Sequence, residues 1–560
     1  MQGCSVNELE QLLTTAGFEP RRPQIALFEH LISATRRGVV AQAGTGTGKS
    51  LAILAAAANR ARATGRQSIV ITPTLTLMNQ YRDGDMPIAA RAFDDLEFGE
   101  LRGRAHYWCE MTKSGNDVMG AEYFGGCLGR DAGCSMKGQG GCDESCDESC
   151  DAIHEKRWNC EYQDAKRAAM SANVVVTNAD MLIVNDRILA PLEANFFDLD
   201  GSLFVDEAHT LDQKLRDYAS RSLHWSSLER FKFAGGAGKA VARWLKNDDG
   251  GVTLRKPTDV PFSDLKAIAE AAMPEERPKD GLTRQRETQE AAARIMAFLQ
   301  DPHDSAVLHV NQGSLKMDWI NVAKSSGELL TARSFGLVSA TIPQTMSASL
   351  GVPGAPFIDV GHPFDYSTQA FIGFSAYGGD YKSAQSSTNF DTRVNEVRDL
   401  LKRSKGGALL LFSSFKDMER VHDALKRDLS DMGLNVHCQE REMDAKERQD
   451  LADAFRADGN AVLFGSESFA TGFDVPGDAL RLVVMWKLPY PAVDPVSNAI
   501  RAKSFPRYND IMKVRAVQAI GRLIRRETDR GIVWVADNRG RRLIDPSDPL
   551  TAHIPEFARL

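Results

Sequence analysis

The sequence predicts an α/β protein with two lobes, each built around a parallel sheet. Short apolar strands alternate with helical stretches in two regions, residues 20–210 and 360–545, and this alternation is typical of parallel sheets. A glycine-rich turn at residues 43–50 lies between a predicted strand and a predicted helix, which is the context of a phosphate-binding loop. At about 150 residues per domain, a chain of 560 residues has room for three or four domains.

The elements of the first lobe follow one another in a regular order. An apolar helix at 25–35 precedes a strand at 38–41, and an alanine-rich helix at 50–63 leads to a strand at 68–72. Each further apolar run is read as a buried strand because loop-forming or helical residues follow it. These runs are 173–177, 202–205 and 334–339, and 408–412, 461–464 and 482–486 in the second lobe.

Two insertions are predicted to interrupt this pattern. Residues 212–332 are charged and rich in alanine, glutamate and arginine, with no strong strand signal except near 307–310, so a helical arch is expected there. A cysteine-rich stretch forms the other insertion. The expected organisation is lobe 1 at 1–105, 166–211 and 333–350, the cysteine-rich insertion at 106–165, the helical arch at 212–332, and lobe 2 at 351–560.

Charge and hydropathy narrow the class of protein only slightly. The 68 Lys and Arg against 75 Asp and Glu give a net charge of −7, which leaves a nucleic-acid partner open because binding needs only a local basic surface. Residues 501–545 carry 12 basic against 5 acidic side chains. These basic side chains either face DNA or form an ordinary solvated surface. The sequence has neither an apolar run of membrane-spanning length nor a signal-peptide pattern, so we expect a cytoplasmic protein with no membrane partner.

The glycine-rich turn predicts a site for ATP. Its backbone N–H groups and the start of the following helix favour phosphate, Lys49 is expected to reach the β and γ phosphates, and the Ser50 hydroxyl is expected to bind Mg²⁺. The predicted nucleotide-binding residues of the turn are Ala43, Gly44, Thr45, Gly46, Thr47, Gly48, Lys49 and Ser50. A purely structural turn is the alternative.

A second motif, LFVDEAH at 203–209, places two carboxylates directly after an apolar strand. Asp206 is expected to hold Mg²⁺, and Glu207 is expected to orient and deprotonate the attacking water. Near the end of the chain, QAIGRLIRR places Gln518, Arg522 and Arg525 at spacings of 4 and 3, which puts them on one face if the segment is helical. We expect the two arginines to stabilise charge on the γ phosphate, unless the segment is only a basic surface helix.

Together these motifs resemble the DinG/XPD group of superfamily 2 helicases over nearly the whole chain. The resemblance implies two RecA-like lobes, an adenine contact by Gln24, DNA-backbone contacts by Thr72, Thr74 and Gln80, and a coupling motif at 339–341. It also matches GHPFDY at 361–366, LFSSF at 411–415 with Ser413 and Ser414 as DNA contacts, and GSESFATGFDVPG at 465–477 with Asp474 at the nucleotide. The chain departs from the group at Gln42, Ser50 and Ala179, and the last substitution removes an imidazole.

Seven of the nine cysteines fall within 52 residues, at 109, 127, 134, 142, 146, 150 and 160. Such clustering in a cytoplasmic protein favours metal binding over disulfides. The resemblance implies a [4Fe-4S] cluster with Cys109 and Cys160 as outer ligands. Cys146 and Cys150 are the predicted inner ligands, with Cys142 next. Zinc or a vestigial, metal-free domain are the alternatives.

The predicted function is an ATP-dependent helicase that moves along single-stranded DNA and unwinds duplexes, with 5′ to 3′ polarity implied by the resemblance. The short chain looks like the type IV CRISPR-associated DinG branch, in which an RNA-guided effector complex would recruit the motor to an R-loop; forked DNA is the other expected substrate. The alternatives are a DNA-repair helicase of the housekeeping DinG type, a translocase that unwinds weakly, a DNA-binding recruitment module, and, more distantly, a small-molecule P-loop kinase.

Overall fold

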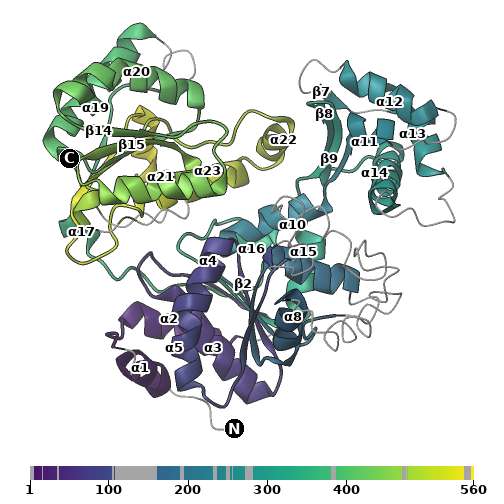
Figure 1. Cartoon of the computed structure of the whole chain (residues 1–560), viewed down its shortest axis with the longest axis horizontal. Coiled ribbons are helices and arrows are strands. Elements are labelled where there is room, and N and C mark those ends of the chain that lie inside the picture. The colour runs from purple at the N-terminus through teal and green to yellow at the C-terminus, as the bar shows by residue number, and fades with distance from the viewer. Residues whose placement is uncertain are drawn as a thin grey trace.

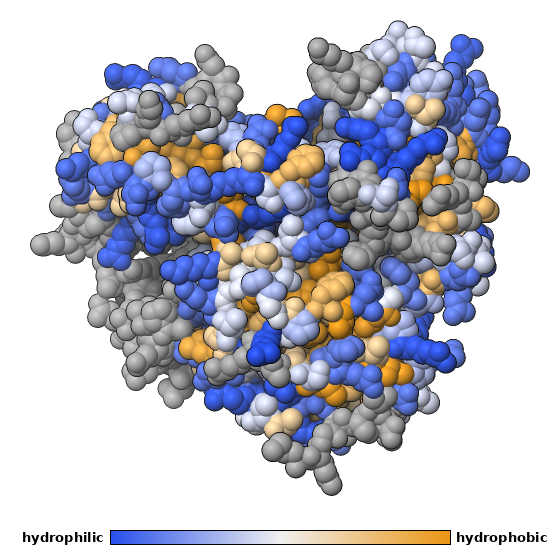
Figure 2. Space-filling model, turned by 180° about the vertical axis from the view of Figure 1, so that it is seen from behind, coloured by the Kyte–Doolittle hydropathy of each residue, from blue (hydrophilic) through white to orange (hydrophobic). Residues whose placement is uncertain are grey.

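The computed structural model has three bodies, with lobe 1 at one end and lobe 2 and the arch side by side above it (Figure 1). Seen from behind, a notch separates the two upper bodies, and hydrophilic and hydrophobic side chains are mixed over the visible face (Figure 2). The structure describes residues 6–15, 17–34, 37–103, 106–107, 161–189, 195–230, 236–247, 252–254, 257–271, 282–379, 386–469, 475, 477–545, 547 and 557–559.

Lobe 1 is built around a seven-stranded parallel sheet with the order β11-β1-β10-β5-β2-β4-β3. Its strands are β1 (Val39–Gln42), β2 (Ser68–Thr72), β3 (Phe98–Leu101), β4 (Val174–Asn178), β5 (Ser202–Val205), β10 (Ser334–Ser339) and β11 (Phe357–Asp359). Two hydrophobic clusters cover the two faces of this sheet. The strands read as continuous apolar runs because both faces are buried.

Helices lie on both faces of the lobe 1 sheet (Figure 1). They are α1 (Val6–Thr15), α2 (Arg22–Ile32), α3 (Lys49–Thr64), α4 (Leu75–Gln80), α5 (Met86–Ala92), α8 (Glu161–Ser171), α9 (Ala179–Ile183), α10 (Leu211–Ala219), α15 (Ala323–Thr331) and α16 (Met346–Ser349). Two π-helical segments, η1 (Tyr81–Asp85) and η5 (Val184–Leu189), extend α4 and α9. The helix α3 is mostly buried because its alanines permit close packing against the sheet.

Lobe 2 contains a second seven-stranded parallel sheet, with the order β14-β15-β13-β16-β17-β12-β18. Its strands are β12 (Ala370–Phe374), β13 (Ala408–Phe412), β14 (Asn435–Cys438), β15 (Ala461–Ser466), β16 (Leu482–Met485), β17 (Gly531–Val535) and β18 (Ala558–Arg559). Its helices are α17 (Tyr366–Gln369), α19 (Ser387–Ser404), α20 (Phe415–Asp431), α21 (Ala445–Ala457), α22 (Pro495–Lys503) and α23 (Phe505–Ile520). The prediction of an α/β protein with two parallel-sheet lobes is confirmed.

The arch differs from its prediction, because it is not helical throughout. Four helices, α11 (Trp225–Arg230), α12 (Ala237–Lys246), α13 (Phe262–Ala269) and α14 (Leu282–Gln300), pack on an antiparallel sheet. The sheet has the order β6-β9-β8-β7, formed by β6 (Arg221–His224), β7 (Val252–Leu254), β8 (Ala306–Asn311) and β9 (Ser314–Trp319). Gln312 and Gly313 both have positive φ in the β8–β9 turn, as a two-residue hairpin loop requires.

The expected boundary between the lobes at residue 351 is also wrong. Strand β11, which lies beyond that boundary, pairs in parallel with β1 and so belongs to the lobe 1 sheet. Gln42 strengthens this junction, since its Nε2 donates to Asp359 Oδ2 at 2.7 Å. Lobe 2 therefore begins after Asp359, and the connecting segment passes directly over the turn that follows β1.

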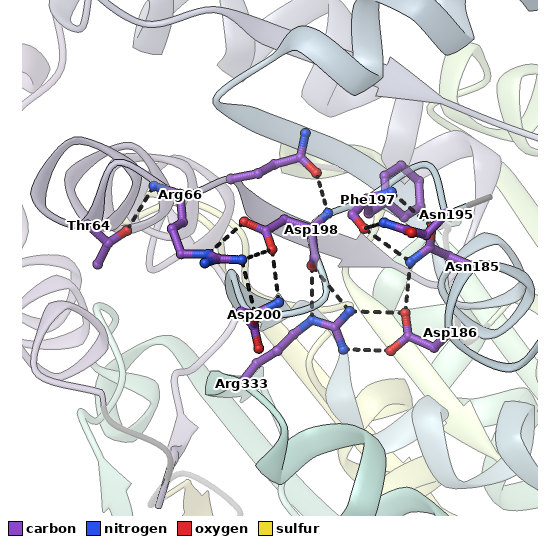
Figure 3. Close-up of polar contacts among 10 residues, drawn as sticks. Thr64, Arg66, Asn185, Asp186, Asn195, Phe197, Asp198, Asp200 and Arg333 are labelled. Atoms are coloured by element: carbon purple, nitrogen blue, oxygen red, sulfur yellow. Dashed lines mark hydrogen bonds and ion pairs between the residues drawn. The ribbon is translucent and has the colours of Figure 1, made fainter. Parts of the chain in front are cut away.

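A polar network, drawn in Figure 3, ties together the amino ends of the central lobe 1 strands, whereas the motif turns follow the carboxyl ends of their strands. Arg333, which is 1% exposed, donates to Asp186 Oδ2 at 2.5 Å and Oδ1 at 3.0 Å. Asp198, just before β5, accepts two hydrogen bonds from Arg66, which lies just before β2. Because Arg333, Asp198 and Arg66 precede the neighbouring strands β10, β5 and β2, this network holds the amino ends of these strands together.

The arch and lobe 2 touch each other through a small apolar cluster of Val307, Ile320, Ile500 and Tyr508. Next to this cluster, Arg507 of α23 makes an ion pair with Asp212 of α10 at 2.6 Å. Asp510, also on α23, accepts hydrogen bonds from the backbone N–H and hydroxyl of Thr345, both at 2.9 Å. Helix α23 therefore connects lobe 2 with both other bodies.

Candidate nucleotide site in the cleft between the lobes

The predicted phosphate-binding turn lies between β1 and α3, at the carboxyl edge of the lobe 1 sheet. Gly46 and Gly48 have φ values of +77° and +81°, which L-amino acids with a side chain rarely adopt. Lys49 begins α3, and its Nζ lies 3.3 Å from the carbonyl oxygen of Ala43. Thr47 is buried and its hydroxyl donates to Gly44 O at 2.6 Å. The sequence folds here into a tight turn with the lysine at its rim.

The segment that enters lobe 2 packs against this turn. A methyl group added to Gly44 would overlap the ring of His362, and one added to Gly46 would overlap Phe364. Thr45 Oγ1 lies 3.2 Å from the hydroxyl of Tyr366. These contacts explain why the turn needs glycine for space as well as for backbone conformation.

Asp206 and Glu207 follow β5 and face the same cleft. Asp206 is 3% exposed, and burial, followed by the neighbouring carboxylate of Glu207, raises the pKa of Asp206 to about 7. Burial also opposes ionisation of Glu207, but Lys49, His209 and other polar neighbours outweigh it and lower its pKa. Glu207 adopts a left-handed backbone conformation with φ 48°, a costly geometry for a residue other than glycine.

A chain of hydrogen bonds runs from Glu207 to lobe 2. Strand β10 lies between β1 and β5, so Ser339 at its end sits beside the acidic motif. The amide nitrogen of Gln518 lies 2.6 Å from His209 Nε2 and can only donate, so His209 carries its proton on Nδ1. Nδ1 then donates to Ser339 Oγ at 2.8 Å, and Ser339 Oγ donates to Glu207 Oε2 at 3.1 Å.

The segment with Gln518, Arg522 and Arg525 does not form one continuous helical face. Helix α23 ends at Ile520, and both arginines lie in the turn that follows. Asp529 stabilises this turn, because its Oδ2 accepts hydrogen bonds from the backbone N–H groups of Arg525 and Arg526, both at 2.8 Å. All three predicted residues nevertheless line one cleft of about 1270 Å³ together with Lys49.

Gln24 lies at the other end of the cleft, on α2. Its Nε2 donates to the carbonyl oxygen of Gly48 at 3.0 Å, and its amide is close enough that a side chain at Gly48 would overlap it. The Arg21 guanidinium donates to the carbonyl oxygen of Gly46. This part of lobe 1 therefore lies against the phosphate-binding turn and supplies polar groups beside it.

The predicted DNA-contacting residues divide between two surfaces. Thr74 caps α4 and, with Gln80, lines the cleft, whereas Thr72 is buried and its hydroxyl donates to Thr74 O at 3.4 Å. Ser413 and Ser414 line a second cavity of about 710 Å³, which arch residues including Lys316 and Trp319 also line. Ser414 caps α20 by accepting a hydrogen bond from Asp417 N at 3.3 Å.

Two residues that contact predicted site residues are absent from the sequence-based prediction. The buried Tyr81 donates its hydroxyl to Asp206 Oδ2 at 3.0 Å, and the Asp85 carboxylate interacts with Ser50, which partly offsets the burial that raises the pKa of Asp85. The only signal for them in the sequence is their position directly after the TPTLTLMNQ motif. Asp474 and the candidate cysteine ligands Cys109, Cys142, Cys146, Cys150 and Cys160 lie outside the described residues.

The fold and the cleft define a two-lobe P-loop NTPase. Residues 21–83 match the model of the DEAD/DEAH box helicase family, and residues 397–544 match that of the helicase C-terminal domain. The "ATP-dependent helicase DinG" of Mycobacterium tuberculosis is 26% identical, covering 96% of this chain and 93% of the relative. The "ATP-dependent DNA helicase YoaA" of Escherichia coli is 26% identical, covering 93% and 92%.

Solved structures agree with this fold. The one titled "XPD_Helicase" matches 100% of both chains with a TM-score of 0.63 at 17% identity, and the one titled "XPD_APO" has a TM-score of 0.58. The chain is similar over almost its whole length to these ATP-dependent helicases, and its two parallel-sheet lobes have the RecA-like fold of the XPD structures. Among its described helices, none combines the length and the apolar character needed to cross a bilayer.

Proposed function

We propose that this chain is an ATP-dependent DNA helicase that moves along one DNA strand and separates duplexes. The observation that carries the proposal is the hydrogen-bond chain from Glu207 through Ser339 and His209 to Gln518, which joins the predicted catalytic base in lobe 1 to lobe 2. A base that is linked to the opposite lobe can report on the state of the nucleotide when the lobes move. The relative YoaA is named a DNA helicase, which supports DNA as the substrate.

The residues of the cleft have separate roles in this proposal. Lys49 binds the phosphates, Glu207 orients and deprotonates water, and Arg522 and Arg525 stabilise the negative charge of the γ phosphate from lobe 2. Mg²⁺, when bound, neutralises charge on the phosphate oxygens. The oxygen atoms of Ser50 and Asp206 fit this ion. The raised pKa of Asp206 also suits a bound cation, because a buried carboxylate beside Glu207 is stabilised in its charged form by positive charge.

The second cavity is the proposed passage for a single strand. The hydroxyl groups of Ser413 and Ser414 and the charged groups of Lys316 and Arg515 suit phosphate contacts, and Trp319 supplies an aromatic ring for stacking. Such contacts recognise the DNA backbone and not its sequence. Binding is therefore expected to be largely independent of sequence and to weaken at high salt.

The proposal is tested by ATPase rates with and without single-stranded DNA and by unwinding of forked duplexes. DNA stimulation that is abolished in Lys49→Ala, with DNA binding retained, supports a motor. Duplexes with one single-stranded tail at either end test the 5′ to 3′ polarity. An ATPase indifferent to DNA contradicts the proposal, while stimulation without unwinding favours a translocase. Biological activity that survives Lys49→Ala favours a passive DNA-binding module.

The cysteine-rich segment is proposed to hold a [4Fe-4S] cluster, with Cys109, Cys146, Cys150 and Cys160 as ligands. Among the residues that the structure describes, no cluster of His, Cys, Asp and Glu side chains is arranged to hold a metal, so the proposal depends on this segment. The described residues on its two sides lie together, because the rings of Tyr107 and Tyr162 are 5.6 Å apart. Metal analysis after anaerobic purification separates iron, zinc and a metal-free domain.

Recruitment to an R-loop by a type IV CRISPR effector complex is proposed on the resemblance alone, and a housekeeping DNA-repair role is the alternative. Co-purification with an RNA-guided effector complex, compared with the Lys49→Ala variant, tests recruitment separately from ATP hydrolysis. Complementation of a strain that is sensitive to DNA damage tests the repair role. Activity in the second assay without binding in the first contradicts recruitment.

A further inference from the structure

The short segment η1 follows α4, whose predicted DNA contacts Thr74 and Gln80 line the same cleft as the nucleotide-binding groups. It is a π-helical turn that continues α4 without a break and leads directly into α5. π-Helical segments are rare and are frequent at functional sites. Thr74 and Gln80, the predicted DNA contacts of lobe 1, lie at the two ends of α4. A displacement of α4 is therefore transmitted to η1 through the backbone.

Tyr81, the first residue of η1, contacts one of the two proposed Mg²⁺ ligands. Its side chain is fully buried in the core of lobe 1, and its hydroxyl donates to Asp206 Oδ2 at 3.0 Å. The other oxygen, Asp206 Oδ1, accepts a hydrogen bond from the Glu207 backbone at 2.9 Å. Both carboxylate oxygens are thus held, and Tyr81 determines the orientation of one of them.

Asp85, the last residue of η1, contacts the other proposed ligand. Its carboxylate interacts with the hydroxyl of Ser50 and lines the cleft. Asp85 Oδ2 is buried and has no hydrogen-bond partner within the part of the chain that is described. Although Asp85 stands at the start of α5, its side chain does not cap that helix. This carboxylate therefore does not act as a helix cap.

We propose that Tyr81 and Asp85 are positioning residues that hold Asp206 and Ser50 for Mg²⁺, and that contact of α4 with a DNA strand acts on the nucleotide site through them. The coupling part of this inference rests on the proposed function. Tyr81 and Asp85 both lie on the five-residue segment η1, so that a single local shift of η1 changes Asp206 and Ser50 together. Neither Tyr81 nor Asp85 is assigned a chemical step.

The test compares Tyr81→Phe and Asp85→Asn with a matched control, Asp83→Asn. Asp83 lies on the same segment but is exposed and paired with Arg82. The first readout is the Mg²⁺ concentration that gives half-maximal binding of a fluorescent ATP analogue, measured without DNA. We expect an increase of roughly 3- to 10-fold in both variants and no change in the control. Tyr81→Phe loses one hydrogen bond, whereas Asp85→Asn keeps an acceptor oxygen but loses the negative charge beside Ser50.

The second readout is the factor by which a single-stranded oligonucleotide changes the affinity for the same analogue. We expect this factor to fall toward 1 in Tyr81→Phe and Asp85→Asn, while Asp83→Asn retains the wild-type factor. Wild-type Mg²⁺ dependence and wild-type coupling in both variants would overturn the inference. If DNA has no effect on the wild-type protein, the proposed function fails, while the Mg²⁺ readout still decides the positioning role. Should Tyr81→Phe unfold, Asp85→Asn carries the test.

Discussion

His209 Nε2 lies 2.6 Å from the side-chain nitrogen of Gln518, although the two residues are 309 positions apart and belong to different lobes. This contact exists only in an arrangement that brings the end of α23 onto the acidic motif. Because His209 also contacts Ser339, which donates to Glu207, the position of lobe 2 is connected to the carboxylate proposed to activate water. In the proposed function, this chain of contacts is a direct structural route between lobe closure and hydrolysis.

Gln518→Ala removes the amide that contacts His209. We expect ATP affinity to change little and DNA-stimulated hydrolysis to fall roughly 10-fold, the effect of about 1.4 kcal/mol in the transition state. Steady-state kinetics that separate kcat from KM provide the measurement. Gln449→Ala is the control, since Gln449 also lines the cleft but its amide bonds Asp453 on its own helix. Equal losses in both variants would contradict the role of the contact.

The pH profile of hydrolysis should reflect His209. Burial lowers the pKa of His209 although Glu207 opposes the shift, and only the neutral ring accepts a hydrogen bond from Gln518. Because its pKa is lowered, the His209 ring is neutral at and above the ordinary histidine value of about 6.5. The ring becomes protonated only as the pH falls through its lower folded-state pKa. At saturating Mg²⁺ and ATP, we expect kcat to stay constant down to about pH 6.5 and to decline below it.

The variant His209→Gln provides the comparison for this profile. Its kcat should be lower than that of the wild-type protein at neutral pH, and the acidic decline that belongs to His209 should be absent. A wild-type profile that already declines well above the ordinary histidine pKa would show that another group controls the rate.

Arg333→Met should destabilise lobe 1 without a direct effect on the cleft. The substitution leaves the mostly buried Asp186 without its cationic partner and with Asn185 as a remaining hydrogen-bond donor (Figure 3), and loss of one member of a buried pair costs at most about 3–5 kcal/mol. Urea unfolding measures this free energy. The double variant Arg333→Met/Asp186→Asn should recover part of the loss, because it removes the unpaired charge. Arg66→Ala, which affects an exposed part of the same network, should have a much smaller effect.

Arg507→Ala should loosen the closure of the second cavity. This side chain pairs with Asp212 beside the apolar cluster that joins the arch to lobe 2. If a DNA strand passes through that cavity, its dissociation should be roughly 3- to 10-fold faster, as expected for one lost charged contact. Stopped-flow dissociation of a labelled oligonucleotide measures this rate. An unchanged rate, with intact thermal stability, would place the strand elsewhere.

The sequence by itself was sufficient for the parallel sheets and the main motifs. Strands such as β2, β5 and β13 were predicted at their observed bounds, because strands that are buried on both faces are continuous apolar runs. The phosphate-binding turn and the acidic motif were recognisable since each is a contiguous segment whose residues act together. The sheet of the arch was missed because strands such as β9, with the sequence SLKMDW, are covered on one face and alternate with polar residues.

Only the tertiary structure decided which distant residues meet. Strand β11 belongs to lobe 1 through its pairing with β1, which lies more than 300 positions earlier in the chain. No local sequence pattern indicates that pairing. The contact of Tyr81 with Asp206 spans 125 positions, and the end of α23 at Ile520 depends on the turn that Asp529 stabilises. Local segments encode their own backbone, whereas the partners of a buried polar group depend on the packing of the whole chain.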